Sequence, residues 1–410
     1  MHNVLSQRVP VPSLVDELLI DIAVRIQLSP TLHALAVERY GAIARWLERD
    51  GSPLRGRLRR LYAQGSMAIG AAIRSKENDD LFDIDLIAEI DWPVGTTPMQ
   101  MLLTLYQAIK GEPGSRYYGE GIVELQTRCV TVHYADMHLD ITPMWRNPAW
   151  AERGGYIAHA KLSAPVSQHA LVAANPWGFA EDFMAKTPAE PWFADVILEK
   201  SYGRAIRANA EPVPEHEALY AKAMAVVALQ LLKRHIYLIY ERKPDGARRP
   251  PSVYIAESVA RHANQTGALI DELIHQAVQL RAPLAAAAQA GQLIDVRNPA
   301  LHEDNLTDRW PSGPLAQRIF MSELDHLIAS LIAAKNETEL PKLRARLAAL
   351  FGENAVLEAL NKYLERAGAE TKQGTSRFQP RTATALAGLS TARSPGVQST
   401  PVRGHRFYGD

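Results

Sequence analysis

Three short stretches of this chain carry residue types that together suit metal and phosphate chemistry. They are the turn Gly65-Ser66, the acidic pair Asp83 and Asp85, and Asp140 within a run of apolar residues. Side chains alternate between the two faces of a strand, so Asp83 and Asp85 point the same way, about 6–7 Å apart. Mg²⁺ prefers oxygen ligands, and pairs of such ions promote in-line displacement at phosphorus. With Asp140 on a neighbouring strand, the three carboxylates predict a two-metal site.

The turn Gly65-Ser66 predicts a phosphate contact. Glycine lets the backbone approach closely, the serine hydroxyl adds a donor, and backbone N–H groups at the start of a following helix suit an anion. No Walker lysine follows the turn. Gly-Ser pairs also occur in many surface turns, and alternating acids are often only solvated. Neither motif alone therefore predicts a functional site, and the prediction depends on finding them together.

Three residues of the second half of the chain could complete a triphosphate site. Lys233 follows an apolar helix face and could hold the phosphates across a cleft, or it could simply solvate the second half of that helix. Ser252 follows two prolines at a helix start, a position suited to phosphate. Tyr254 could stack on a base.

The periodicity around these residues changes along the chain. Apolar residues recur at helical spacing near the N-terminus, and Ser29 with Pro30 marks the start of a second helix. The middle of the chain then alternates between strands and helices, and two strand-like runs meet at Ala135 and Asp136 as a β-hairpin. We expect strands at 61–63, 81–90, 123–134 and 137–143, and helices at 13–28, 30–47, 67–73 and 98–109. Further helices are expected at 218–241, 253–266, 269–290, 314–335, 340–350 and 353–368.

This order predicts an α+β chain of four parts. Residues 1–57 form bracing helices, 58–195 a sheet domain, and 196–370 a helical domain. Residues 371–410 form a tail with six Lys or Arg and one Asp, a net charge of 6 − 1 = +5. The tail is poor in bulky apolar residues, and such a segment is expected to stay disordered until it binds a partner.

The composition narrows the function classes. Lys plus Arg and Asp plus Glu both total 45, whereas a protein that grips long nucleic acid usually carries a basic excess. The single cysteine, Cys129, excludes an intramolecular disulfide and is expected in the core. No signal core and no membrane-length apolar stretch of ~20 residues occurs. We therefore expect a soluble cytoplasmic protein with no membrane partner and no sequence-specific nucleic acid.

Gly65-Ser66, Asp83, Asp85 and Asp140 resemble the motif set of the polymerase-beta-like nucleotidyltransferase superfamily. Other short segments of the sequence resemble its bacterial cGAS/DncV-like branch, whose members make cyclic oligonucleotide signals in anti-phage defence. These segments are Asn175-Pro176-Trp177-Gly178-Phe179, Leu231-Leu232-Lys233-Arg234-His235, Asn298-Pro299, Asp304-Asn305-Leu306 and Trp310. The resemblance covers roughly residues 30–330 and implies a nucleotidyltransferase sheet domain packed against a helical domain, with the nucleotide cleft between them.

The resemblance also implies roles for single residues. Asp83 and Asp85 would bind two Mg²⁺ ions, with Mn²⁺ as an alternative, and Asp140 would ligate the catalytic metal and help activate the acceptor 3′-hydroxyl. Ser66, with Lys233 and Ser252, would contact the triphosphate of ATP or GTP. The product would be a cyclic di- or trinucleotide, with adenine as the default base.

Three matters stay open at this point. The acids Glu77, Asp79 and Asp80 are either solvated or mute activity until a partner binds. The resemblance suggests a HORMA-type or ubiquitin-transfer-like accessory protein, which the 371–410 tail could bind. An RNA-tailing enzyme, another kind of nucleotidyltransferase, and a catalytically silent nucleotide sensor remain the alternative functions.

Overall fold

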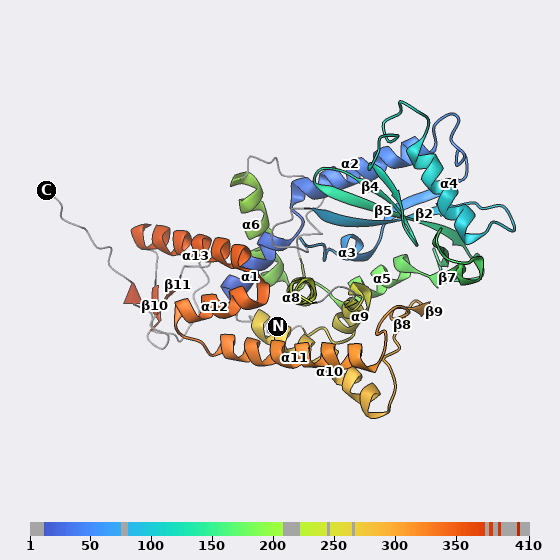
Figure 1. Ribbon diagram of the computed structural model, residues 1–410. Coiled ribbons are helices and arrows are strands. Elements are labelled where there is room, and N and C mark those ends of the chain that lie inside the picture. Colours follow the sequence, from blue (N-terminus) through green and yellow to red (C-terminus); the bar gives the residue numbers. More distant parts are fainter. Residues whose placement is uncertain are drawn as a thin grey trace, which may run out of the picture.

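The computed structural model describes residues 12–74, 81–207, 222–243, 247–264 and 267–373, together with three short strands in the tail. Figure 1 shows a twisted sheet with its own helices at one end of the molecule and a bundle of helices at the other, with α8 and α9 between them. The predicted α+β class is confirmed. The acidic loop at 75–80 lies outside the described residues.

The central sheet has seven strands. Its order is β1-β2-β5-β4-β3, and β6 and β7 extend it beyond β5. Strands β2 and β5 run parallel, while the other paired strands run antiparallel. The strands are β1 (Leu58–Ala63), β2 (Phe82–Ile90), β3 (Val123–Leu125), β4 (Val130–His133), β5 (Met137–Arg146), β6 (Gly155–His159) and β7 (Ala170–Ala174).

One face of the sheet is covered by α2 (Pro30–Leu47) and α4 (Pro98–Lys110). Both helices begin as expected, because the side chains of Ser29 and Thr97 accept backbone N–H groups of the first turn. The apolar residues of β2 that alternate with Asp83 and Asp85 pack against these helices. The two aspartates therefore lie on the opposite face, which looks toward the helical half.

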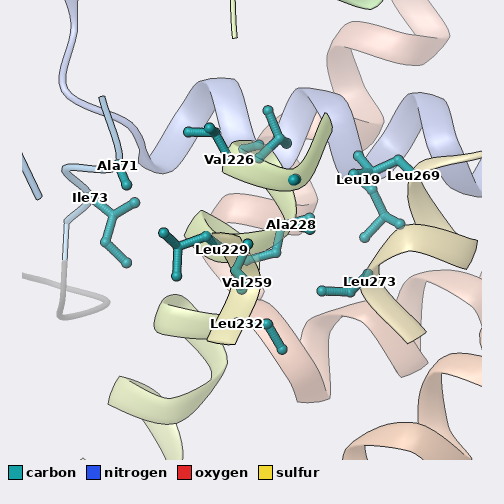
Figure 2. Packing of buried hydrophobic residues seen from close by; sticks show 14 of the residues in the cluster. Leu19, Ala71, Ile73, Val226, Ala228, Leu229, Leu232, Val259, Leu269 and Leu273 are labelled. Atoms are coloured by element: carbon teal, nitrogen blue, oxygen red, sulfur yellow. The ribbon is translucent and has the colours of Figure 1, made fainter. Parts of the chain in front are cut away.

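The helical half is built around α8 (Met224–Glu241), whose apolar side chains pack against α1, α9 and α10 (Figure 2). Helix α1, expected beside α2 as a brace for the sheet, is buried in this second core instead. The other helices of this half are α1 (Leu14–Ile26), α6 (Pro191–Arg207), α9 (Ser252–Arg261), α10 (Leu269–Gln289), α11 (Pro314–Lys335), α12 (Leu340–Phe351) and α13 (Glu353–Gln373). The domain boundaries given above stay a prediction.

Between the halves lie α3 (Gly65–Ala68), α5 (Pro176–Lys186) and the hairpin of β8 (Arg297–Asn298) and β9 (Leu301–Asn305). The helix predicted at 67–73 is wrong in its bounds, since α3 begins at Gly65 and ends at Ala68. Beyond it the chain is fastened to the helical half, because Ala71 and Ile73 enter the core around α8 (Figure 2). The Gly65-Ser66 turn is thus attached to both halves.

Two further expectations need comment. The strand expected at 123–134 is divided into β3 and β4, because the chain folds back at Gln126, whose N–H donates to the carbonyl of Cys129. In the tail, β10 (Arg377–Gln379) pairs with both β11 (Thr384–Leu386) and β12 (Thr400–Pro401). Apart from these strands, the residues after 373 lie outside the described residues. Among the helices that the structure describes, none is both long and apolar enough to span a bilayer.

Candidate active site

The predicted site residues meet at one cavity of 620 Å³ between the sheet and the helical half. Its lining includes all three predicted aspartates, the Gly65-Ser66 turn, Lys233 and Ser252. Tyr254 alone among the predicted site residues is absent from it. Residues from both halves of the chain therefore form a single cleft.

The carboxylates are brought together by the parallel pairing of β2 with β5. Asp85 lies directly opposite Asp140, and Asp83 lies opposite His138. Neighbouring strands are about 4.8 Å apart, so Asp85 and Asp140 are next to each other on one face of the sheet. Asp85 and Asp140 are 55 positions apart in the sequence, and this one strand pair brings them together.

The close approach of these acids changes their protonation. Burial, helped by the charges of Asp140 and Asp83, raises the pKa of Asp85 to about 7. Burial also raises the pKa of Asp140, while the Thr131 hydroxyl, which donates a hydrogen bond of 2.5 Å to Asp140 Oδ1, opposes that rise. The carboxylates therefore lack enough positive charge around them, which is the condition that a bound cation relieves.

Cys129 lies beside these acids and not deep in the sheet core. It is half-buried, and burial together with the charges of Asp140 and Asp85 raises the pKa of its thiol. At neutral pH the residue is an uncharged thiol, so it adds no negative charge to the site.

The donor set suits a hard divalent cation in kind, since three carboxylates line one cavity wall and carboxylate oxygens are what Mg²⁺ binds. Within the described residues, however, no three His, Cys, Asp or Glu side chains are gathered closely enough to hold an ion between them. The side chains fit the predicted metal by chemistry, and they would have to converge around it.

Lys233 supplies positive charge from the opposite wall. Its ammonium donates to the carbonyl oxygen of Ala71 (2.8 Å), and its side chain is almost fully buried. Burial lowers the pKa of Lys233 to about 8, while the charges of Asp85 and Asp83 raise it. Lys233 was expected either to face the sheet across a cleft or only to solvate its helix, and the structure favours the first of these.

Ser252 is the first residue of α9, and the residues that precede and follow it also line the cavity. No side chain caps this helix start. Its free N–H groups and the positive end of the helix dipole therefore face the cavity. Together with Ser66, this arrangement offers donors for an anion on both walls.

Tyr254 is not in the cleft, and its predicted stacking role is wrong. The residue is 1% exposed, and its ring stacks on Trp310 with the ring centroids 5.7 Å apart. Helical spacing explains the error, because Tyr254 follows Ser252 by two positions and so points away from the face that carries the serine. Tyr237 of α8 instead lines the cavity, and the Arg249 guanidinium lies 3.9 Å from its ring centroid.

Several cavity residues were missed, among them Arg128, Arg248, Arg249 and Arg309. Two of these have a sequence signal, since Arg248 and Arg249 immediately precede the Pro250-Pro251-Ser252 phrase. Arg309 likewise precedes Trp310, whereas nothing local marks Arg128.

The segments around Asn175, Asn298 and Asp304 prove to form one junction. The Asp304 carboxylate accepts hydrogen bonds from the Asn175 backbone N–H (3.0 Å) and the Asn298 side chain (2.8 Å). Asn298 also donates to the Asn175 carbonyl oxygen (3.0 Å). These three residues join the start of α5 to the β8–β9 hairpin, which closes one end of the cavity.

Comparison with known proteins identifies the family. Residues 14–161 match the model of the Second Messenger Oligonucleotide or Dinucleotide Synthetase domain. The cyclic dinucleotide synthase CdnG of Bradyrhizobium diazoefficiens is 37% identical over 408 residues, which cover 96% of this chain and 94% of that protein. The chain belongs to the bacterial cGAS/DncV-like nucleotidyltransferases.

Two solved structures share the fold of this chain. That of Bradyrhizobium diazoefficiens CdnG in complex with GTP superposes with a TM-score of 0.75 at 36% identity, covering 86% of this chain and 100% of that one. A complex of CdnC with a HORMA protein from E. coli MS115-1 superposes with a TM-score of 0.55 at 13% identity, covering 82% and 96% of the two chains, and shows the fold alone.

A c-di-GMP synthase of Roseivirga ehrenbergii is 21% identical over 96% of this chain and 97% of its own length. The chain described here, as a cGAS/DncV-like nucleotidyltransferase, is an enzyme of cyclic oligonucleotide synthesis.

Proposed function

We propose that this enzyme joins two nucleoside triphosphates into a cyclic dinucleotide and that GTP is one of its substrates. The observation that carries the proposal is the pairing of Asp85 with Asp140 on the wall of a cavity whose other wall presents Lys233 and Ser252. The choice of GTP is supported by the CdnG relative, whose structure was solved with GTP. Adenine, and with it ATP, remains a prediction for the second position.

In the proposed reaction, the 3′-hydroxyl of one nucleotide attacks the α-phosphorus of another, and pyrophosphate leaves. A second transfer in the opposite direction closes the ring. Ser66, Lys233 and the start of α9 would hold the triphosphate of the donor, and Asp140 would help to activate the attacking 3′-hydroxyl. Positioning and charge neutralisation supply most of the rate enhancement in such transfers.

Asp83, Asp85 and Asp140 would hold Mg²⁺, or Mn²⁺ in its place. When bound, the metal would neutralise the charge that develops on the phosphates and favour ionisation of the attacking hydroxyl. The raised pKa of Asp85 supports this assignment, since a buried acid among like charges gains most from a cation.

The decisive assay uses the full chain with labelled ATP and GTP, separately and together, in the presence of Mg²⁺. We expect a phosphatase-resistant product that is lost in the double variant Asp83→Asn with Asp85→Asn. Asp91→Asn is the matched control, because Asp91 is an exposed acid just beyond the same strand and pairs with Arg59. Turnover by the double variant comparable to wild type contradicts the assignment of these acids.

The same assay separates the alternatives. Label transferred to added RNA would indicate a tailing enzyme, and a product made only from ATP would exclude GTP as a substrate. Absence of product with every substrate would favour a nucleotide sensor or an enzyme that needs an activator. A role in anti-phage defence and binding of a HORMA-type or ubiquitin-transfer-like partner through the tail remain predictions. Deleting residues 371–410 and measuring basal activity and partner binding tests the second.

A further inference from the structure

The cavity holds two separate groups of cationic side chains. Lys233 and Arg249 form the first, and the charge of Arg249 lowers the pKa of Lys233. Arg128, Arg248 and Arg309 form the second, named here the arginine cluster. Arg248 and Arg249 are consecutive, yet Arg249 lies over Tyr237 whereas Arg248 donates to the carbonyl oxygen of Arg309 (3.1 Å).

The Ser66 turn and Arg128 lie on opposite sides of the carboxylates. In the sheet order β1-β2-β5-β4-β3, the Ser66 turn follows β1, the aspartates are on β2 and β5, and Arg128 precedes β4. The span from β1 to β4 is three strand spacings, or about 14 Å. Ser66, which is expected to hold one triphosphate, and Arg128 of the arginine cluster therefore lie on either side of the strands that carry the aspartates.

The arginine cluster has more positive charge than its neighbours neutralise. Arg128 and Arg309 both form ion pairs with Asp308. Burial and the charges of Arg128 and Arg248 lower the pKa of Arg309, whereas Asp308 raises it. Asp304 also lines this part of the cavity; burial raises the pKa of its carboxyl, while the charge of Arg128 lowers it. Three guanidinium groups against these two carboxylates leave an excess of positive charge, which favours a ligand with several negative charges.

Arg128 is held in place for such a ligand. Its Nε–H donates to Nδ1 of His159 (2.9 Å), and a second nitrogen pairs with Asp308 on the helical side of the cavity. Burial and the nearby charge of Arg128 lower the pKa of His159, so its ring is neutral at pH 7 and can accept this hydrogen bond. The guanidinium is thus fixed at the cavity wall before any ligand arrives.

We infer that the arginine cluster binds the triphosphate of the second nucleotide, the one whose 3′-hydroxyl attacks. This inference rests on the proposed function, because only an enzyme that joins two nucleoside triphosphates must hold a second polyphosphate while the first reacts. The cluster lies on the Asp140 side of the site, where the attacking hydroxyl must be. A neutral base would leave its excess charge without a partner.

The test gives each reagent a single role. A 2′,3′-dideoxynucleoside triphosphate can donate its nucleotide but has no hydroxyl with which to attack. An α,β-methylene nucleoside triphosphate can attack but cannot lose pyrophosphate, and the free nucleoside can attack without any phosphates. Formation of the linear dinucleotide is measured against the concentration of each acceptor, with guanosine and adenosine compounds run in parallel.

Arg309→Gln is the test variant, because this side chain is about half exposed and its loss should leave the fold intact. We expect its KM for the triphosphate acceptor to rise by about tenfold or more, the factor of one hydrogen bond to a charged group. Its KM for the nucleoside acceptor should stay at the wild-type value, and Arg309→Lys should recover part of the loss. Arg297→Gln is the matched control, since Arg297 is on the β8–β9 hairpin that precedes Arg309 but pairs with Asp295 and does not line the cavity.

Equal losses with both acceptors would overturn the inference and assign the cluster to the base or the fold. Equal KM values for the two acceptors in the wild type would overturn it as well. If the wild type joins no pair of substrates, the proposed function fails instead. Equilibrium binding of the α,β-methylene triphosphate then still tests the site. Two molecules per wild-type chain, of which one binds about tenfold more weakly to Arg309→Gln, support it, and unchanged affinities in Arg309→Gln contradict it.

Discussion

Gly65 and Asp85 lie so close together that no side chain fits between them. A Cβ atom placed on Gly65 would be 2.9 Å from Oδ2 of Asp85, and Gly65 has a φ of +56°, in the left-handed region. The preceding residue reinforces this contact, since the Gln64 N–H donates to the Asp85 carbonyl oxygen (2.9 Å). The turn expected to hold phosphate and the acid expected to hold metal are therefore one rigid unit.

Gly65→Ala should abolish nucleotidyl transfer while the protein stays folded. The new methyl group would push the Asp85 carboxylate from its place, and the strained backbone would cost about 1–2 kcal/mol of stability. Gly56→Ala is the control, because Gly56 also has a positive φ (+69°) but has open space around it. The thermal unfolding and product formation of both variants are compared. Full activity in Gly65→Ala would show that the close contact has no role in catalysis.

Asp85 should make the metal-free protein less stable as the pH rises. The folded state keeps the proton of Asp85 up to about pH 7, whereas the ordinary pKa of an aspartate is 3.8. Its contribution to stability is therefore complete below pH 3.8 and is lost as the pH rises to about 7. We expect a loss on the order of 2–4 kcal/mol relative to Asp85→Asn, in which this slope is absent.

Urea unfolding of the wild type and of Asp85→Asn in chelator-treated buffer, from acidic to neutral pH, measures this difference. Added Mg²⁺ should restore the stability of the wild type at neutral pH and should do little for the variant. Parallel stability curves for the two proteins would mean that Asp85 ionises normally.

Thr131→Val should move the acidic limb of the pH–activity profile to higher pH. The Thr131 hydroxyl donates to Asp140 Oδ1 and so favours the ionised carboxylate. Without this hydrogen bond the pKa of Asp140 rises further, and activity should fall several-fold below neutral pH but little at alkaline pH. Thr142→Val, on the same strand as Asp140 and also buried, is the control. A uniform loss of activity at all pH values would indicate a purely structural role for Thr131.

Substitution of two tyrosines near the cleft should have different effects on the KM for nucleotides. Tyr254→Phe should leave the KM for nucleotides unchanged, because the ring is buried against Trp310 and its hydroxyl has no hydrogen-bond partner in the described residues. Tyr237→Leu should raise that KM by about tenfold, a typical loss when one aromatic side chain stacked on a base is removed. Steady-state kinetics of both variants measure the two KM values, and a raised KM in Tyr254→Phe would show that this hydroxyl contacts the nucleotide after all.

Local signals were sufficient for most of the elements. Helix α4 was predicted from Thr97, Pro98 and the apolar spacing that follows, and α11 was predicted at 314–335, where it lies. Signals failed where packing against distant residues decides the conformation. The chain after Gly65 does not stay helical, because Ala71 and Ile73 gain more by entering the core around α8.

For the site, the chemical types of residue were visible in the sequence, but their distances were not. Asp83 and Asp85 lie on one strand, so the twofold period of a strand alone places them on one face. The position of Asp140 depends on the parallel pairing of β2 with β5, which no local pattern encodes. Arg128 and Asp308 pair although they are 180 positions apart in the sequence, and no local motif around either residue predicts this pairing.

Residue types and their local spacing were enough to predict which residues could bind metal and phosphate, Asp140 included, and that the turn at Gly65-Ser66 precedes the acids. Only the folded chain shows that Asp140 lies directly opposite Asp85, that Tyr254 belongs to the core, and that an arginine cluster lines the cavity. The physical reason is that side-chain chemistry and strand or helix periodicity are local properties. The charge around a group, its burial and its partners depend on which distant segments the hydrophobic cores bring together.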